Sequence, residues 1–310
     1  MTERLDWERD GQGWPHRDAS RFVMAAGLRW HVQQMGPQHL PQAPWALLVH
    51  GTGAATHSWR GLMPLLAAHF NVLAADLPGH GFTGMGPAWQ MSLPGMSQAL
   101  GALLVALKVS PQLIVGHSAG AAIGARMGLD GHAAPAALVS LNGALLPLGG
   151  LPGLLFPPVA RLMAAVPLVP KLFSRRADSA SVRRLIEGTG STLDATGAEL
   201  YGRLLRSPGH AAGALAMMAN WDLRPLEHDF PRLQARLTLV VGANDRAVPP
   251  EQARRVQALV PGARLVTLDG LGHLAHEERP ELLAGVVLDA SRGGPHPNPL
   301  PEGEGARTSA

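Results

Sequence analysis

Leu113-Ile114-Val115-Gly116-His117-Ser118-Ala119-Gly120 is the stretch of this 310-residue chain that decides its fold. A short apolar run leads into a Gly-x-Ser-x-Gly turn, and a helix-length stretch, 119–129, leads out of it. A sharp turn from strand to helix pushes the serine hydroxyl out of the sheet, and flanking glycines keep side chains from colliding there. A glycine-rich turn with an ordinary helix-capping serine has the same local pattern, so the interpretation depends on the rest of the chain.

Short apolar runs bounded by glycine, proline or aspartate recur at the spacing of strand–helix units. Their continuous apolar character is typical of parallel strands covered on both faces. Helix-length amphipathic stretches, such as 95–107, lie between them, so the sequence predicts an α/β fold with a doubly wound, mostly parallel sheet. Segments 22–23 and 28–32 flank Gly27 and predict an antiparallel edge hairpin. The predicted parallel strands are 45–49, 72–75, 113–115, 136–141, 237–241 and 264–268.

The strand–helix alternation stops between about residues 146 and 224. The stretch 145–170 is apolar but contains several prolines, which one straight helix cannot accommodate; helical patterns follow at 181–186, 196–205 and 210–220. We therefore predict a core of residues 1–145 and 225–290, with residues 146–224 inserted as a helical cap over the carboxyl edge of the sheet. Residues 291–310 lack apolar periodicity, which predicts a disordered tail.

Two residues downstream of Ser118 can activate its hydroxyl, which is a poor nucleophile without an adjacent base. Asp245 follows the predicted strand 237–241, and His273 lies in a loop after the predicted strand 264–268. This is the order serine, acid, histidine. The predicted catalytic residues are Ser118 as nucleophile, His273 as general base and Asp245 as the carboxylate that fixes the imidazole tautomer. Taken singly, Asp245 could be a turn carboxylate and His273 a loop histidine without a task.

Acyl transfer also needs hydrogen-bond donors for the negative charge that develops on the substrate oxygen. The turn after the predicted strand 45–49 offers them, so the backbone amides of Thr52 or Gly53, together with Ala119, form the predicted oxyanion hole. His50 in the same turn is predicted to bond within its loop. Asp76, after the predicted strand 72–75, is predicted to belong to a structural turn.

Three other histidines are alternative bases. His117 is less suited because the residue before an elbow serine points away from it, and His276 stands at a predicted helix start. His57 is the third alternative base. No His/Asp/Glu cluster has convincing metal-ligand spacing, so we expect no metal and no cofactor.

Composition narrows the class of protein further. With 46% hydrophobic residues the chain can bury a large core, and its lack of cysteine excludes disulfides, thiolate metal sites and a cysteine nucleophile. A formal charge of +3 without a dense Lys/Arg stripe makes nucleic acid an unexpected partner. The chain has no apolar run of about 18 residues and no basic start followed by an apolar stretch, so we expect a cytoplasmic protein.

The predicted cap helps to determine which substrate binds, because it is expected to cover Ser118. Met217, Met218 and Trp221 are candidate lining residues of an apolar pocket, since methionine adapts to bulky ligands, although a methionine pair in a helix also serves plain packing. One flank is basic, which fits either a solvated helix face or a surface that attracts substrate carboxylates or an anionic membrane. The second interpretation places the protein at the periphery of the inner membrane. The basic residues are Lys171, Arg175, Arg176, Arg183 and Arg184.

With these motifs in place, the chain resembles the α/β-hydrolase superfamily and, within it, the magnesium chelatase accessory proteins of bacteriochlorophyll biosynthesis. The resemblance covers roughly residues 14–285 and implies an α/β-hydrolase fold, with the triad positions at Ser118, Asp245 and His273. It also implies a role around magnesium insertion into protoporphyrin IX, with chelatase subunits as partners, but no known reaction; the proline-rich tail departs from the pattern. The matching segments are Leu28-Arg29-Trp30-His31-Val32-Gln33, 51–60, 116–122, Gly209-His210-Ala211-Ala212-Gly213 with the residues to 218, and 270–278.

Three functions fit these observations. The first is a serine hydrolase acting on an ester, lactone or similar acyl bond of a bulky apolar substrate, with a tetrapyrrole as one candidate. The second is a non-hydrolytic accessory protein whose cavity binds a porphyrin or a chelatase subunit. The third is a generic capped hydrolase, haloperoxidase-like enzyme or C–C bond hydrolase unrelated to pigment. Dehalogenases and epoxide hydrolases do not fit, because they use a carboxylate where this chain has Ser118.

Overall fold

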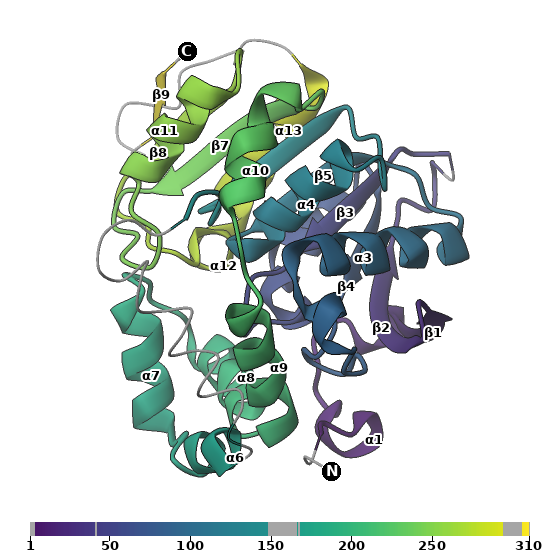
Figure 1. Cartoon of the computed structure of the whole chain (residues 1–310), viewed down its shortest axis with the longest axis vertical. Helices are drawn as coiled ribbons and strands as arrows, with labels where there is room; N and C mark the ends of the chain where they lie inside the picture. The colour runs from purple at the N-terminus through teal and green to yellow at the C-terminus, as the bar shows by residue number, and fades with distance from the viewer. Residues whose placement is uncertain (1–3, 41, 148–165, 167, 294–305, 310) are drawn as a thin grey trace.

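The computed structural model describes residues 4–40, 42–147, 166, 168–293 and 306–309, which contain a nine-stranded sheet with helices on both faces (Figure 1). The strand order is β1-β2-β4-β3-β5-β6-β7-β8-β9. Strands β3 to β8 run parallel, whereas β1, β2 and β9 pair antiparallel with their neighbours. The strands are β1 (Ser20–Ala25), β2 (Leu28–Met35), β3 (Trp45–Val49), β4 (Asn71–Ala75), β5 (Pro111–His117), β6 (Ala137–Leu141), β7 (Arg236–Gly242), β8 (Arg264–Leu268) and β9 (Ala306–Ser309).

The predicted α/β class is confirmed, and so is each predicted parallel strand, with β3 and β8 at the predicted bounds. The edge hairpin is also confirmed: β1 pairs with β2 in a register that sets Phe22 opposite His31.

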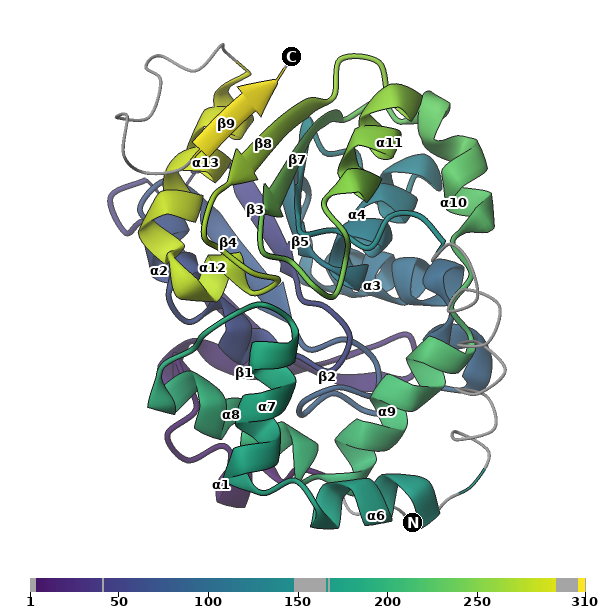
Figure 2. The same ribbon diagram turned by 90° about the vertical axis from the view of Figure 1, so that its left-hand side faces the viewer.

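Two hydrophobic cores lie on opposite faces of the sheet because successive side chains of a strand point to opposite sides. In β3, Leu47 and Val49 enter the core under α3, α4 and α11, whereas Ala46 and Leu48 enter the core under α2 and α13. Figure 2 shows α2, α12 and α13 on one side of the sheet and α3, α4, α10 and α11 on the other. These helices are α2 (Leu62–Ala67), α3 (Leu93–Leu107), α4 (Ala119–Leu129), α10 (Arg224–Asp229), α11 (Glu251–Leu259), α12 (Ala275–Glu278) and α13 (Pro280–Arg292).

The described part of segment 146–224 is helical and packs against loops at the carboxyl ends of the strands. Arg60 Nη2 contacts Asp194 Oδ1 at 2.6 Å, and the Tyr201 hydroxyl donates to Glu277 Oε1 at 2.8 Å. Most of the proline-rich stretch 145–170 lies outside the described residues. The helices are α6 (Leu168–Arg175), α7 (Ser179–Gly188), α8 (Ala195–Leu205) and α9 (Pro208–Ala219), and a short α1 (Trp7–Asp10) precedes the sheet.

The carboxyl-terminal segment differs in part from the predicted disordered tail. Helix α13 continues to Arg292, and Ala306–Ser309 form β9 on the free edge of β8. Edge pairing satisfies backbone groups whatever the side-chain pattern, which is why apolar periodicity did not reveal β9. Residues 294–305 and 310 lie outside the described residues. Among the described helices, none has both the length and the apolar character needed to cross a bilayer.

Candidate active site

Ser118 lies at the turn between β5 and α4 with φ 51° and ψ −119°, a conformation that strains a serine. The glycines on either side are sterically required. A Cβ on Gly116 would lie 2.4 Å from Ala121 Cα, and a Cβ on Gly120 would lie 2.0 Å from the Val49 carbonyl oxygen. The Ser118 side chain makes no capping hydrogen bond to α4. The turn therefore has the geometry of a nucleophile elbow and not that of an ordinary capped helix.

Asp245 follows β7, and both oxygens of its carboxylate accept hydrogen bonds. Oδ1 accepts from the backbone amides of Ala247 and Val248 at 2.8 and 2.9 Å. Oδ2 accepts from Asn142 Nδ2 at 2.7 Å and from His273 Nδ1 at 2.8 Å. Four donors around one carboxyl group match the acceptor capacity of an ionised carboxylate, and they fix its orientation toward His273.

His273 lies in the loop after β8 and is 7% exposed. Because Nδ1 donates to Asp245, the lone pair of Nε2 is free to accept a proton. The ring packs against that of His117, the residue before Ser118, with centroids 4.7 Å apart. Among the described hydrogen bonds, none joins Ser118 Oγ to His273 Nε2. Such bonds are often long in a free enzyme and tighten when substrate binds. The structure thus brings base and acid into contact beside the elbow.

The predicted oxyanion turn lies against the elbow. The Ala54 amide donates to the Gly51 carbonyl at 3.2 Å, and Gly53 has φ +76°, so the chain reverses within four residues. A Cβ on Gly51 would lie 2.9 Å from Ser118 Cβ. Ala119 begins α4, where a backbone amide has no acceptor within its own helix. The turn that carries the predicted donors Thr52 and Gly53 is therefore in contact with the elbow through Gly51, and the third predicted donor, Ala119, directly follows Ser118.

His50 holds this turn, as predicted. Its Nε2 accepts from the Leu77 amide at 2.9 Å, so Nδ1 carries the proton and donates to the Gly51 carbonyl at 2.8 Å. Burial lowers the pKa of His50 below its usual value, so the neutral ring that this pattern needs is favoured.

Helix α9 of the cap is anchored to the predicted oxyanion turn through His210, to which the sequence pattern assigns no functional role. Nδ1 of His210 accepts from the Gly81 amide at 3.0 Å, and Nε2 donates to the Gly53 carbonyl at 3.0 Å. Burial lowers the pKa of His210 to about 4. One turn further along α9, a Cβ on Gly213 would lie 2.0 Å from the Gly79 carbonyl oxygen. Cap and core are therefore in direct backbone contact beside the site.

Asn142 is the second residue that sequence reasoning missed. It follows β6 with φ 48°, a conformation that asparagine tolerates better than most residues. Besides Asp245, its Nδ2 donates to the Gly272 carbonyl at 3.0 Å, so one amide ties the loops of the acid and the base together. Its position at the carboxyl end of a predicted parallel strand is the one feature of the sequence that could have marked Asn142 as a site residue.

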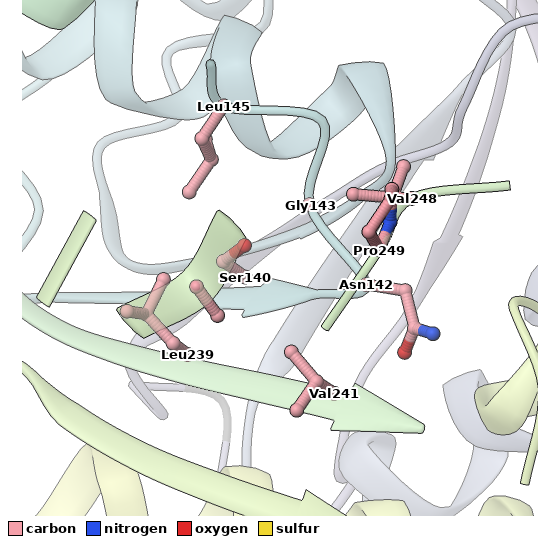
Figure 3. A pocket seen from close by; sticks show the side chains of 9 residues that line it. Ser140, Asn142, Gly143, Leu145, Leu239, Val241, Val248 and Pro249 are labelled. Atoms are coloured by element: carbon pink, nitrogen blue, oxygen red, sulfur yellow. The ribbon is translucent and has the colours of Figure 1, made fainter. Parts of the chain in front are cut away.

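A small cavity of about 10 Å³ lies behind this asparagine (Figure 3). Its wall includes Ser140, Leu145, Val241 and Val248 as well as Asn142. A volume of this size holds about one water molecule. It is therefore not a substrate pocket.

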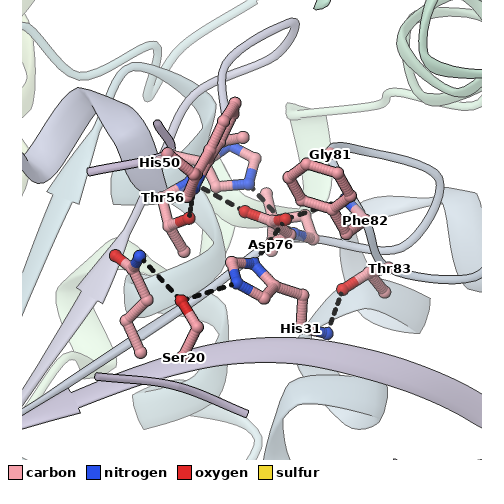
Figure 4. A network of polar contacts seen from close by, with 12 residues as sticks. Ser20, His31, His50, Thr56, Asp76, Gly81, Phe82 and Thr83 are labelled. Carbon is pink, nitrogen blue, oxygen red and sulfur yellow. Dashed lines mark hydrogen bonds and ion pairs between the residues drawn. The ribbon is translucent and has the colours of Figure 1, made fainter. Parts of the chain in front are cut away.

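Asp76 is completely buried and joins several segments of the core, which confirms its structural interpretation (Figure 4). Oδ1 accepts from the Thr56 amide at 2.7 Å, and Oδ2 accepts from the Phe82 amide at 2.9 Å and from His31 Nδ1 at 2.8 Å. Burial alone would raise the pKa of the Asp76 carboxyl, but His31 and these hydrogen bonds hold it well below its usual range.

The alternative bases are placed differently from His273. Burial lowers the pKa of His57 and His117 well below the usual value and that of His276 to about 3. Nε2 of His117 contacts the backbone carbonyl of His273 at 2.9 Å, so this ring nitrogen is engaged with the loop that carries His273. Of the four candidate bases, His273 alone is hydrogen-bonded to a carboxylate within the described part of the chain.

The candidate pocket residues lie on or just after α9. Met217 is fully buried, and the Thr52 hydroxyl donates to its sulfur at 3.4 Å. Met218 and Trp221 are half-buried, and Trp221 packs against the main core. Met217 is therefore the member of this group that borders the oxyanion turn. No grouping of three or more potential metal ligands occurs within the described ranges.

A strained serine after a central parallel strand and a buried histidine–carboxylate pair on the neighbouring strand ends define a protein of the α/β-hydrolase class. The chain belongs to the alpha/beta hydrolase family, whose model matches residues 46–286.

Comparison with known proteins confirms the resemblance to magnesium chelatase proteins. The magnesium-chelatase 30 kDa subunit of Rhodobacter capsulatus is 37% identical over 277 residues, which are 89% of this chain and 95% of that protein. An alpha/beta hydrolase fold protein from Burkholderia ambifaria has a TM-score of 0.72 at 23% identity, over 93% of this chain and 100% of its own. The enol-lactonase of Burkholderia xenovorans LB400 has a TM-score of 0.69 at 22% identity, over 87% and 98%. The last two bear on the fold alone.

Proposed function

We propose that this protein is an accessory factor for magnesium insertion into protoporphyrin IX in bacteriochlorophyll biosynthesis, and that it contains a working serine hydrolase centre. The similarity to the Rhodobacter chelatase subunit supports the pathway. The observation that carries the chemistry is the pairing of His273 Nδ1 with a fully hydrogen-bonded Asp245 beside the strained Ser118. Magnesium is cargo in this proposal and not a resident cofactor.

The proposed reaction is an acyl transfer in two halves. The Ser118 oxygen attacks the acyl carbon while His273 Nε2 takes the hydroxyl proton, and Asp245 stabilises the imidazolium that forms. The amides of Thr52 or Gly53 and of Ala119 stabilise the negative charge on the substrate oxygen. His273 then returns the proton to the leaving group, and water attacks the acyl-enzyme by the same route in reverse. An ester or related acyl bond of a bulky apolar molecule, such as a tetrapyrrole, is the proposed substrate class, because Met217 borders the oxyanion turn.

Labelling with a fluorophosphonate probe tests the chemistry, since such probes react with activated serines. The wild-type protein should be labelled on one serine, and Ser118→Ala should abolish the labelling. Ser110→Ala is the matched control because Ser110 is an exposed serine just before β5, and this variant should be labelled like the wild type. An intact wild-type protein whose Ser118 stays unlabelled would overturn the hydrolase proposal.

A second candidate is a non-hydrolytic accessory protein that binds a porphyrin or a chelatase subunit. It is favoured by a relative that is named as a chelatase subunit and not as a hydrolase. Complementation separates the two candidates. If Ser118→Ala restores pigment fully in a deletion strain, binding suffices; if it does not although the variant is folded and abundant, catalysis is required. Normal pigment in the deletion strain would overturn the pathway for both.

A further inference from the structure

Helix α6 lies at one end of the molecule along its long axis, opposite β7 to β9, and α7 runs from that end toward the sheet (Figures 1 and 2). Charge is unevenly distributed on this cap tip, defined here as residues 166 and 168–188. All its basic side chains are exposed, and within the described residues none of them is ion-paired; the hydrogen bond from Arg184 to the Ser181 hydroxyl leaves the charge in place. Asp178 and Glu187 are the acidic members, and Asp178 accepts from the Ser181 amide at the start of α7. The basic members are Lys171, Arg175, Arg176, Arg183 and Arg184.

Apolar side chains are exposed among these charges. Leu172 is 47% exposed, Leu185 is 52% exposed and Val166 is 41% exposed. Helix α7 is already anchored to the core through Val182 and Ile186, which are buried in a cluster with Leu274. Leu185 is therefore exposed although α7 is anchored: the helix packs one apolar face inward, and Leu185, directly after Arg183 and Arg184, faces solvent.

We propose that the cap tip docks on the surface of an anionic phospholipid bilayer. Lipid phosphates attract unpaired lysine and arginine side chains, and the interfacial layer below them accepts short apolar side chains. Lysine and arginine reach headgroups through their own alkyl stems while a neighbouring leucine inserts. A bilayer supplies both kinds of partner within one surface. An acidic protein would have to match Leu172 and Leu185 with apolar pockets of its own, placed among carboxylates. The inference does not depend on whether Ser118 is catalytic.

Vesicle co-sedimentation with the full chain tests this proposal. The protein should bind phosphatidylcholine vesicles that contain phosphatidylglycerol and should not bind pure phosphatidylcholine. Binding should weaken as salt is raised, because surface charges are screened. Equal binding to both vesicles would overturn the proposal, as would the absence of binding to either at low salt. Equally tight binding to soluble polyglutamate would overturn it in favour of an acidic protein partner.

Paired variants locate the surface. Arg183→Gln/Arg184→Gln should weaken partition into anionic vesicles by about fivefold per charge removed. Arg254→Gln/Arg255→Gln is the control: it also removes two consecutive exposed arginines, from α11 at the opposite end of the molecule, although Arg255 pairs there with Glu227 at 3.3 Å, and it should change partition much less. Equal effects of the two pairs would mean that only net charge matters and would overturn the assignment to the cap tip. Lys171→Gln/Arg175→Gln repeats the test on α6 should the α7 pair affect folding.

A second pair of variants tests insertion of the apolar side chains. Leu185→Gln should weaken binding severalfold, whereas Val105→Gln on α3, where the side chain is 78% exposed, should not. Circular dichroism and melting confirm that each variant is folded. If Leu185→Gln binds as tightly as wild type, the proposed docking face is wrong.

Discussion

Replacing His210 tests the connection between the cap and the oxyanion turn. The neutral ring accepts from the Gly81 amide at Nδ1 and donates to the Gly53 carbonyl from Nε2; protonation removes the Nδ1 lone pair and breaks the first of these bonds. In His210→Gln one of these bonds can re-form, and in His210→Ala neither can. Above pH 6.5 we therefore expect a loss of about 1 to 2 kcal/mol of unfolding free energy for the glutamine variant and ~2 to 4 kcal/mol for the alanine variant.

The pH dependence of stability is more diagnostic than its value at one pH. The pKa of His210 falls from 6.5 to about 4 on folding. Between these values the unfolded chain binds a proton that the folded chain does not, so wild-type stability decreases as pH falls, by up to about 1.4 kcal/mol per pH unit. The full difference is about 3 kcal/mol, reached below the folded pKa. Neither variant has a titrating side chain at position 210, so neither loses this free energy as pH falls. The glutamine variant should therefore equal or exceed the wild type in unfolding free energy near pH 4.

Urea unfolding of the three proteins at a series of pH values between 7.5 and 4 measures both quantities. Fluorophosphonate labelling of Ser118 at neutral pH adds a readout of the oxyanion turn, and both His210 variants should be labelled more slowly than the wild type while still folded. A stability gap between wild type and variant that stays constant with pH would refute the reasoning, because it would show that His210 titrates alike in the folded and unfolded chains.

Three further perturbations have definite expected outcomes. Asn142→Ala removes a hydrogen bond to the Asp245 carboxylate and should cost ~1.5 to 3 kcal/mol in urea unfolding and slow probe labelling at least tenfold. Burial raises the pKa of Glu277 to about 8, so folding favours its neutral form, and stability should fall as pH rises from 4.5 toward 8. Glu277→Gln keeps a partner for Tyr201 and should melt higher than wild type at pH 8 but equally at pH 4.5; a pH-independent difference would contradict this. Ser118→Gly relieves a positive φ and should raise stability by about 1 kcal/mol while abolishing labelling, and an unchanged melting temperature would show that the elbow is unstrained.

The parts of the fold that follow from local pattern could be predicted from the sequence. Continuous apolar runs located the parallel strands, and the glycines around Ser118 located the elbow, because no Cβ fits at Gly116 or Gly120. The chain order placed Asp245 and His273 at neighbouring strand ends, where the structure joins them by a 2.8 Å hydrogen bond.

The residues that sequence reasoning missed act through contacts between distant segments. Asn142 bonds to a residue 103 positions away, and His210 bonds to Gly53 at a separation of 157 positions. Asn142 belongs to no local motif. His210 lies in the segment 209–218 that carries the family resemblance, but nothing in that segment assigns the ring a role, and the chain has fourteen histidines. Strand β9 was not predicted for a different reason. Its pairing with β8 uses backbone groups, and these leave no pattern of hydrophobic residues in the sequence.

The Asp76 network has a consequence for shortening the chain. The family model begins to match at residue 46, beyond the β1–β2 hairpin, so the hairpin looks dispensable when judged by that model alone. Yet β2 contributes His31, the partner of a carboxylate with no access to solvent. A truncated chain starting at β3 would keep that buried charge without its partner, at a cost of about 3 to 5 kcal/mol. The hairpin is therefore part of the minimal folding unit, and expression trials should retain it.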